Sequence, residues 1–481
     1  MQYKYAPLYP TDVGLPHKEF WSGQREGVEQ VLDLWHQGIR VVMVNGPTGA
    51  GKSLVGVGSA ATYAMLHEMD LDVTVLTQTK DLQNQYVEEF DTAECATGRS
   101  NHSCATSNSI RANRCPYIGT PTPCDFDCPY RIQRDRAKLA PIRAINYALY
   151  GATGDLFHAP IMIADEADYL GELLVQAKSA DLSLLVQEYG LEVPQGYVNH
   201  KELDDVLLKI AEDSASPEER EACKHGRELL VSKKWAVKGV GNFLVPYPES
   251  KIVQAFVRQP TIIMSATVFA PQYWSKEWNI PIGWVELPCA VPASNRPIRL
   301  MNTMKINART TEFEWLTVIE EVDRLVAEML SCGNDKGVVH SVSNHLTDLI
   351  LKHSKYKYLM IKAAGETRLK GINTFLNTKR GILIGPNLLR GLNLPDDQCR
   401  FIIFPKIPYP HMGDPRIQEM LKGGEERYQV ETLSALVQGA GRGIRNREDH
   451  CETFILDSGA SWLFKQTKDW LPAWFREAIV Y

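Results

Sequence analysis

A phosphate-binding loop is the clearest chemical signal in the sequence. The stretch Gly46-Pro-Thr-Gly49-Ala-Gly51-Lys52-Ser53 fits the pattern G-x-x-x-x-G-K-[ST] and directly follows the β-branched run RVVMVN (40–45). Glycines allow backbone N–H groups to surround a phosphate at a helix N-terminus, where the helix dipole favours negative charge. We therefore expect Gly46, Gly49 and Gly51 to line this loop, Lys52 to reach the β- and γ-phosphates, and the Ser53 hydroxyl to bind Mg²⁺.

An acidic pair supplies the second half of such a site. Asp165 and Glu166 stand directly after an apolar run in IMIADEAD (161–168). An enzyme with a phosphate loop needs an acidic Mg²⁺ ligand at the end of a neighbouring strand. The sequence predicts that Asp165 binds Mg²⁺, and that Glu166 orients or deprotonates the attacking water.

Two arginines near the carboxy-terminus are a third candidate. Arg442 and Arg445 lie three positions apart in QGAGRGIR (438–445), a spacing that places both on one helix face. Arginines opposite a phosphate loop stabilise the charge on a transferring phosphoryl group. Gln438 begins the same stretch and is a candidate nucleotide contact.

Four cysteines interrupt the chain in a short, loop-rich stretch. Their spacing is Cys104-x10-Cys115-x8-Cys124-x3-Cys128, and Cys95 lies nearby. Structural zinc usually has paired C-x2–4-C ligands, and only the last pair comes close to this pattern. Four irregularly spaced thiols also suit an iron–sulfur cluster, so the residues alone leave cluster, zinc and unligated thiols open.

Composition limits the setting of this chemistry. The chain has 481 residues, 44% of them hydrophobic, with a formal net charge of −6. This charge argues against a nucleic-acid binder that uses its whole surface. The chain has neither an 18-residue apolar run nor a signal peptide at its start, so we expect a cytoplasmic protein that does not cross a membrane.

The elements that must position these residues follow an alternating strand and helix pattern, which is typical of parallel α/β sheets. We predict two α/β lobes of the nucleotide-binding type, with two insertions in the first. The first lobe comprises 1–89, 145–170 and 259–295, the last of these with a linker. A cysteine domain covers 90–144, a mostly helical insert covers 171–258, and the second lobe covers 296–481.

Taken in order, these motifs resemble a superfamily 2 helicase with two RecA-like lobes, and more closely the iron–sulfur DNA helicases of the XPD/DinG family. The carriers are FWSGQREGVEQ (20–30), GRSNHSC (98–104), INYALY (145–150), SAT (265–267), GPNLLRGLNLPDD (385–397), KIPYPHMGDP (406–415), QGAGRGIR (438–445) and LPAWFREA (471–478). The resemblance implies ATP and Mg²⁺ as cofactors, with Gln24 reading the adenine. It also favours a [4Fe–4S] cluster on Cys104, Cys115, Cys124 and Cys128 in the 90–144 segment, and relates the separate 171–258 insert to the family's arch domain.

The family resemblance also implies a substrate. It predicts a monomer, in the cytoplasm or associated with a nucleoid, that moves 5′→3′ on single-stranded DNA and opens forks or overhangs. The resemblance implies that Thr77, Ser341 and Ser343 contact the DNA backbone. Aromatic candidates for base stacking are Tyr130, Tyr147, Tyr150, Phe404 and Tyr409, although single aromatics of this kind are more often core residues.

Two departures from the family and three alternatives remain at this point. Gly391-Leu-Asn393 stands where relatives usually have Gly-x-Asp, and the 171–258 insert is short for an arch domain. The alternatives are a DEAD-box-like RNA helicase with a zinc-bound insert, a translocase that strips proteins from DNA, and a redox-sensing nucleic-acid-binding protein without turnover.

Overall fold

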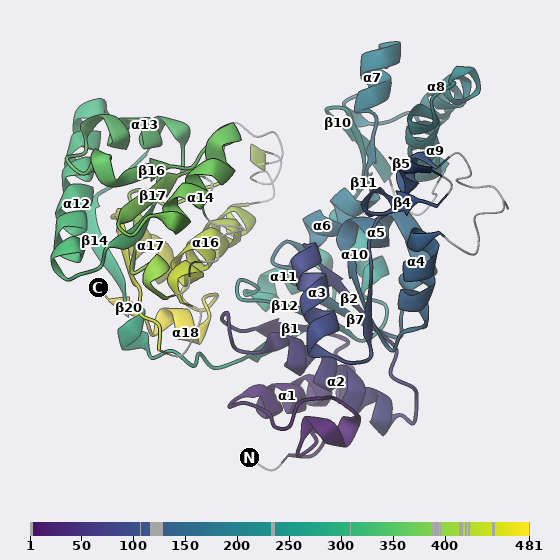
Figure 1. The fold of residues 1–481 in the computed structure, drawn as a ribbon, viewed down its shortest axis with the longest axis horizontal. Coiled ribbons are helices and arrows are strands. Elements are labelled where there is room, and N and C mark those ends of the chain that lie inside the picture. Colours follow the sequence, from purple (N-terminus) through teal and green to yellow (C-terminus); the bar gives the residue numbers. More distant parts are fainter. Residues whose placement is uncertain are drawn as a thin grey trace. The chain divides into compact units, whose positions relative to one another are not determined.

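The structure is a computed structural model, and the chain forms two compact units (Figure 1). It describes residues 3–105, 107–115, 128–231, 236–307, 309–386, 388, 394, 396–412, 417–418, 421, 424–444 and 448–480. One unit comprises residues 1–44, 52–265 and 274–285, and the other comprises 45–51, 266–273 and 286–481. None of the described helices is long and apolar enough to cross a membrane.

A seven-stranded sheet forms the centre of the first unit. Its strands, in spatial order, are β13 (Ile282–Glu286), β1 (Val41–Asn45), β12 (Thr261–Ser265), β7 (Ile161–Asp165), β2 (Val73–Thr77), β6 (Ile142–Asn146) and β3 (Ala93–Ala96). The neighbours from β12 to β3 pair in parallel. Strands β1, β12, β7 and β2 are buried along their whole length, which explains their nearly continuous apolar sequences. Parallel pairing brings Thr77, Asp165 and Ser265, the last residues of three adjacent strands, to the same edge of the sheet.

Helices accompany this sheet in the order that the sequence pattern predicts. They are α1 (Gln24–His36), α2 (Lys52–Leu66), α3 (Lys80–Glu89), α4 (Pro129–Leu139), α5 (Tyr147–Thr153), α6 (Leu170–Lys178), α10 (Glu249–Phe256) and α11 (Pro271–Trp278). Helix α2 lies close to the sheet because Gly56 has no side chain. A Cβ at Gly56 would lie 3.3 Å from Ile163 Cδ1 and 3.3 Å from Met264 Sδ.

The cysteine segment is joined to the sheet at both ends. The sequence pattern assigned residues 90–144 to a separate cysteine domain, but strand β3 lies within this range, strand β6 begins in it, and both pair in the main sheet. A short antiparallel hairpin of β4 (Ser103–Cys104) and β5 (Ser107–Arg111) lies between them. Helix α4 then begins directly after Cys128.

The second insertion is a folded subdomain with its own core. The sequence predicted mostly helix, and α7 (Ser183–Tyr189), α8 (His200–Asp213) and α9 (Pro217–Val231) are present. The structure adds an antiparallel sheet in the order β8 (Ala180–Asp181), β11 (Phe243–Tyr247), β10 (Ala236–Val240) and β9 (Gly196–Tyr197). Figure 1 labels its two longer strands, β10 and β11. Buried side chains from both layers pack together, among them Leu182, Leu207, Leu229, Val237 and Leu244.

The second unit repeats the parallel-sheet architecture. Its strands, in spatial order, are β16 (Met360–Lys362), β17 (Gly381–Gly385), β15 (Lys336–His340), β18 (Phe401–Phe404), β19 (Glu452–Asp457), β14 (Ile298–Met304) and β20 (Ile479–Val480). All six neighbouring pairs are parallel. The accompanying helices are α12 (Glu312–Ser331), α13 (Asn344–His353), α14 (Arg368–Asn377), α16 (Glu426–Ala440), α17 (Gly459–Gln466) and α18 (Ala473–Arg476). These two sheets confirm the predicted fold class of two RecA-like lobes.

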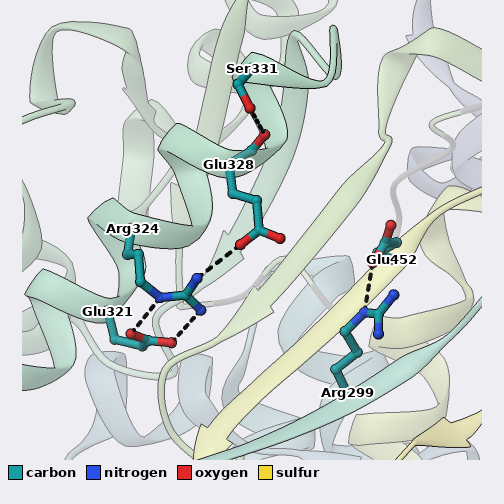
Figure 2. Close-up of polar contacts among 6 residues, drawn as sticks. All are labelled: Arg299, Glu321, Arg324, Glu328, Ser331 and Glu452. Carbon is teal, nitrogen blue, oxygen red and sulfur yellow. Dashed lines mark hydrogen bonds and ion pairs between the residues drawn. The ribbon is translucent and has the colours of Figure 1, made fainter.

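The ion pairs of Arg324 and Arg299 lie at the surface of this unit (Figure 2). Arg324 of α12 pairs with Glu321 at 2.7 Å and with Glu328 at 2.9 Å, and Arg299 of β14 pairs with Glu452 of β19 at 2.8 Å. Exposed pairs of this kind contribute about 0–1 kcal/mol each. The fold of the unit is therefore stabilised mainly by its apolar core, in which α12 and α13 pack on the central strands.

Candidate nucleotide-binding site

The phosphate loop has the local structure that its motif predicts. Strand β1 ends at Asn45 and helix α2 begins at Lys52, so residues 46–51 form the turn between them. Gly49 and Gly51 have φ angles of +81° and +68°, a left-handed conformation that glycine adopts without steric cost. The glycines at these two positions are therefore required by the backbone, and Lys52 and Ser53 occupy the first turn of the helix.

The acidic pair lies at the carboxyl end of β7. Asp165 is the last residue of the strand and is 7% exposed, while Glu166 is half-buried. Glu166 has a φ angle of +48° and donates its backbone N–H to Asp165 Oδ1 at 2.9 Å. A left-handed backbone at a residue other than glycine is costly and concentrates at functional sites.

Neighbouring groups shift the pKa of the Asp165 carboxylate. Burial and the adjacent Glu166 charge raise the pKa of Asp165 to about 7, although the positive charge of Lys52 and a hydrogen bond from Tyr86 oppose this rise. Tyr86 of α3 donates its hydroxyl to Asp165 Oδ2 at 2.9 Å. A buried carboxylate with a raised pKa gains strongly from a nearby cation, which offsets the burial cost of its charge.

Ser53 has a partner that the sequence did not indicate. Its hydroxyl donates to both carboxylate oxygens of Glu89, at 2.9 Å and 2.8 Å. The hydroxyl of Ser53 and the carboxylate of Asp165 are both hard oxygen ligands, the kind that Mg²⁺ prefers. The residues present therefore fit the predicted Mg²⁺ in their chemistry.

Ser265 connects the neighbouring strand to the acidic loop. It ends β12, is fully buried, and donates its hydroxyl to Asp168 Oδ1 at 3.2 Å and to Glu166 Oε2 at 3.5 Å. The side-chain amide of Gln78 donates to the backbone oxygen of Glu166. The predicted water-orienting residue is thus held by side chains from the ends of two other strands.

Gln24 is fixed at the start of helix α1. Its side chain is 2% exposed, and its Oε1 accepts the backbone N–H of Trp21 at 2.7 Å. This contact closes the turn before the helix, whose N-cap is Gly23 in a left-handed conformation. The adenine-reading role of Gln24 stays a prediction.

Gln438 and Arg442 belong to the second unit. Gln438 is half-buried in α16, and Arg442 lies in the following 3₁₀ turn, Gly441–Gly443. Burial and the positive charge of Arg442 lower the pKa of His340 to about 3, and the His340 ring stacks on Phe404 at 4.7 Å. Arg445 lies outside the described residues, as do Gly391 and Asn393.

The implied strand contacts have internal partners in this structure. Thr77 and Ser341 are fully buried; the hydroxyl of Thr77 donates to the Thr79 oxygen at 3.2 Å, and Ser341 Oγ lies 2.6 Å from Thr347 Oγ1. The Ser343 hydroxyl caps α13 by accepting the N–H of Leu346 at 3.2 Å. These hydroxyls therefore shape the loops, and their contact with a DNA strand stays a prediction.

Most of the aromatic candidates are core residues. Tyr130, Tyr147, Tyr150 and Phe404 are at most 7% exposed, so the structure contradicts a stacking role for them and supports the core alternative. Tyr147 donates its hydroxyl to the Asp165 backbone oxygen at 3.2 Å. Tyr409 is half-buried and stacks on Tyr428 at a centroid distance of 5.5 Å.

The predicted metal cysteines are only partly described. Cys104 is buried, Cys115 and Cys128 are half-buried, and Cys124 lies outside the described residues. Within the described part of the chain, no three His, Cys, Asp or Glu side chains gather as a metal site. The three described thiols therefore do not converge, and the iron–sulfur cluster stays a prediction.

Two family models match the chain. The model described as "Helicase C-terminal domain" matches residues 329–478, and "Type III restriction enzyme, res subunit" matches residues 17–121. The first covers most of the second unit, and the second covers the phosphate loop and the start of the cysteine segment.

Curated relatives match short stretches. The "ATP-dependent DNA helicase CHL1" of Vanderwaltozyma polyspora is 29% identical over 115 residues, which are 20% of this chain and 14% of that protein. The human "Regulator of telomere elongation helicase 1" is 30% identical over 138 residues, which are 25% of this chain and 10% of that protein. The matched stretch thus spans only a small part of these relatives.

Solved structures resemble the chain over nearly its whole length. An XPD helicase superposes with a TM-score of 0.63 at 15% identity, covering 94% of this chain and 98% of that one. The S. tokodaii protein Xpd4 gives a TM-score of 0.58 at 12% identity, covering 93% and 98%. At these identities the likeness establishes the fold.

Proposed function

We propose that this chain is a superfamily 2 helicase of the XPD type, and that it couples ATP hydrolysis to movement along single-stranded DNA and to the opening of duplex DNA. The observation that carries this proposal is the convergence at one sheet edge of the first unit. There the ends of β7 and β12 hold Asp165, Glu166 and Ser265, and Lys52 lies near enough to influence Asp165 electrostatically.

Each residue of this edge has one task in the proposed reaction. Lys52 binds the β- and γ-phosphates, while Ser53 and Asp165 hold Mg²⁺, which neutralises charge on those phosphates when bound. Glu166 orients the attacking water and accepts its proton, and the hydrogen bond from Ser265 keeps the carboxylate in place. Gln24 and Gln438 are assigned to the nucleotide, and Arg442 and Arg445 to the charge that develops on the transferring phosphoryl group.

DNA is favoured over RNA by the curated relatives, one of which is named as a DNA helicase. The 5′→3′ polarity, the preference for forks or overhangs and the monomeric state follow from the family resemblance. RNA-stimulated hydrolysis would instead support the DEAD-box-like alternative, and hydrolysis on single strands without strand separation would support a protein-stripping translocase.

ATP hydrolysis with and without nucleic acid tests the proposal. The purified chain should hydrolyse ATP in the presence of Mg²⁺, faster with single-stranded DNA than with single-stranded RNA, and Lys52→Ala should abolish this activity. Exposed Lys80→Ala is a matched control of the same charge and should retain basal hydrolysis. DNA binding without turnover in the wild-type chain would contradict the proposal and would favour the redox-sensing alternative.

A [4Fe–4S] cluster on Cys104, Cys115, Cys124 and Cys128 is part of the same proposal. It rests on the family resemblance and on the thiolate chemistry of the segment, and no step of the proposed reaction runs through it. Anaerobically purified protein should contain iron and absorb broadly near about 400 nm. Cys128→Ser should remove this band and impair strand separation more than hydrolysis, whereas colourless, zinc-containing protein would overturn the assignment.

A further inference from the structure

One face of helix α3 contacts both predicted Mg²⁺ ligands. Tyr86 and Glu89 are three residues apart, a spacing that places their side chains together on a helix. Tyr86 donates to Asp165, and Glu89 accepts from Ser53. The helix begins at Lys80, directly after the loop that carries Gln78, the residue whose amide contacts Glu166. A single short segment thus touches all three predicted metal and water residues.

The contact between Ser53 and Glu89 fixes the direction of the serine hydroxyl. A hydroxyl has one proton to donate and two lone pairs to offer. Because both Glu89 oxygens lie within 2.9 Å of Ser53 Oγ, the proton points toward Glu89. The lone pairs then point away from Glu89, which leaves them available for a cation.

Glu89 is itself held in place. His17 Nε2 lies 3.4 Å from Glu89 Oε1, and the His17 ring packs at 5.4 Å from the fully buried ring of Phe90. The Glu89 side chain is 21% exposed. Its carboxylate therefore sits in a partly buried setting between a histidine and a serine.

The position of Glu89 is unfavourable for the helix alone. It is the last residue of α3, where the helix dipole disfavours negative charge, and the last turn has no basic residue. A carboxylate at the carboxyl end of a helix destabilises that helix. A local rule broken in this way is typical of a residue retained for function.

We propose that Glu89 is a positioning residue for Mg²⁺, which it serves by orienting the Ser53 hydroxyl and by adding negative charge beside the metal site. This inference rests on the proposed function, because it assumes that Ser53 and Asp165 bind the Mg²⁺ of a magnesium nucleotide. Carboxylates that hydrogen-bond to metal ligands typically change metal affinity about 10–100-fold when they are removed.

The test is a titration of the protein–ADP complex with Mg²⁺, in which the fluorescence of an ADP analogue reports binding. A second measurement determines binding of the same ADP analogue in EDTA, without metal. Glu89→Ala should weaken Mg²⁺ binding to this complex about 10-fold, and should leave metal-free ADP binding and the melting temperature unchanged. Glu89→Gln keeps an acceptor for the serine proton and should weaken Mg²⁺ binding less. Glu88→Ala removes an exposed carboxylate of the same helical turn and should behave like the wild-type chain.

Three outcomes would overturn the inference. Unchanged Mg²⁺ affinity in Glu89→Ala would show that the serine needs no orientation. Tighter Mg²⁺ binding would show that Glu89 obstructs the site. Equal loss of ADP binding with and without Mg²⁺, in both Glu89 variants, would show a purely structural role. Failure of the proposed function looks different, because the wild-type chain would then show no Mg²⁺-dependent ADP binding.

Discussion

The two parallel sheets each end one strand with a buried aspartate, and the surroundings of the two acids differ. Asp165 ends β7 in the first unit, and Asp457 ends β19 in the second. Asp165 is contacted by the Tyr86 hydroxyl and lies near the charge of Lys52. Asp457 accepts the backbone N–H groups of Gly459, Ile306 and Ile407, at 2.9, 3.3 and 3.5 Å.

This difference distinguishes Asp165, which has a proposed role in the reaction, from Asp457, which has a structural role, although both end a strand of a parallel sheet. Burial raises the pKa of both acids. Asp165 has a side-chain donor, Tyr86, and a backbone donor, the adjacent Glu166, whereas the three backbone donors around Asp457 join three separate segments of the chain. Position and burial are alike for Asp165 and Asp457, so the hydrogen-bond partners are what distinguishes the roles assigned to the two aspartates.

The largest expected effect is on the first sheet and follows from Glu166→Gln. Glutamine keeps the shape of the side chain but cannot accept a proton from water, so we expect a loss of about 10²–10⁴-fold in ATP turnover. ATP affinity should stay close to that of the wild-type chain. Single-turnover hydrolysis and equilibrium nucleotide binding measure the two quantities, and undiminished turnover would remove Glu166 from its assigned role.

The next effect is on the second sheet and follows from Asp457→Ala. Three backbone donors lose their acceptor, and each buried unsatisfied group costs about 1–3 kcal/mol. Hydrogen exchange of the amides of β19 should therefore become much faster, while ATP affinity should change little. Asp457→Asn retains an acceptor oxygen and should show a smaller effect.

Asp165→Ala is the matched variant in the first sheet. It should abolish Mg²⁺-dependent nucleotide binding. Exchange of the β7 amides should become faster by less than exchange of the β19 amides in Asp457→Ala, because one hydroxyl and one backbone N–H lose their acceptor instead of three backbone N–H groups. If the two alanine variants gave the opposite pattern, the distinction between the two strand ends would be wrong.

The smallest expected effect is a dependence of stability on pH, and it concerns a residue of the second sheet. His340 ends β15, and burial with the Arg442 charge lowers its pKa from 6.5 to about 3. Because the folded state keeps His340 neutral while the unfolded chain takes up a proton below pH 6.5, stability should fall as pH drops from 6.5 toward 3. The loss is about 1.4 kcal/mol per pH unit.

Urea unfolding of the second unit at pH 7 and pH 5.5 measures this loss. His340→Asn cannot titrate, so its unfolding midpoint should fall less between these two pH values than that of the wild-type chain. Equal falls in both proteins would show that His340 is not held neutral.

The sequence predicted the local features of the site and missed the long-range ones. The phosphate loop and the acidic pair are each set by a few consecutive residues, so their strand and turn context could be anticipated. The contact between Ser53 and Glu89 joins residues 36 apart, and that between Tyr86 and Asp165 joins residues 79 apart. Neither pair has a spacing rule, because both depend on how α3 packs beside the sheet.

The sequence pattern predicted the two main sheets of the fold but missed some of the strands. Alternating strands and helices predicted both parallel sheets, but β3 was hidden in the cysteine segment because its four residues, Ala-Glu-Cys-Ala, have little strand propensity. The antiparallel sheet of the insert was missed because its two longer strands are only five residues each and contain Gly239 and Pro246. The aromatic candidates show the same limit, since sequence alone does not separate a buried ring from a stacking surface.

Strand separation on tailed duplexes tests the central claim most directly. A fluorescent DNA duplex with a 5′ single-stranded tail, mixed with the chain, ATP and Mg²⁺, should be opened. The same duplex with a 3′ tail should stay intact, and so should the 5′-tailed duplex with Lys52→Ala. Opening of a tailed RNA duplex with neither DNA duplex separated would contradict the account of this chain as a DNA helicase.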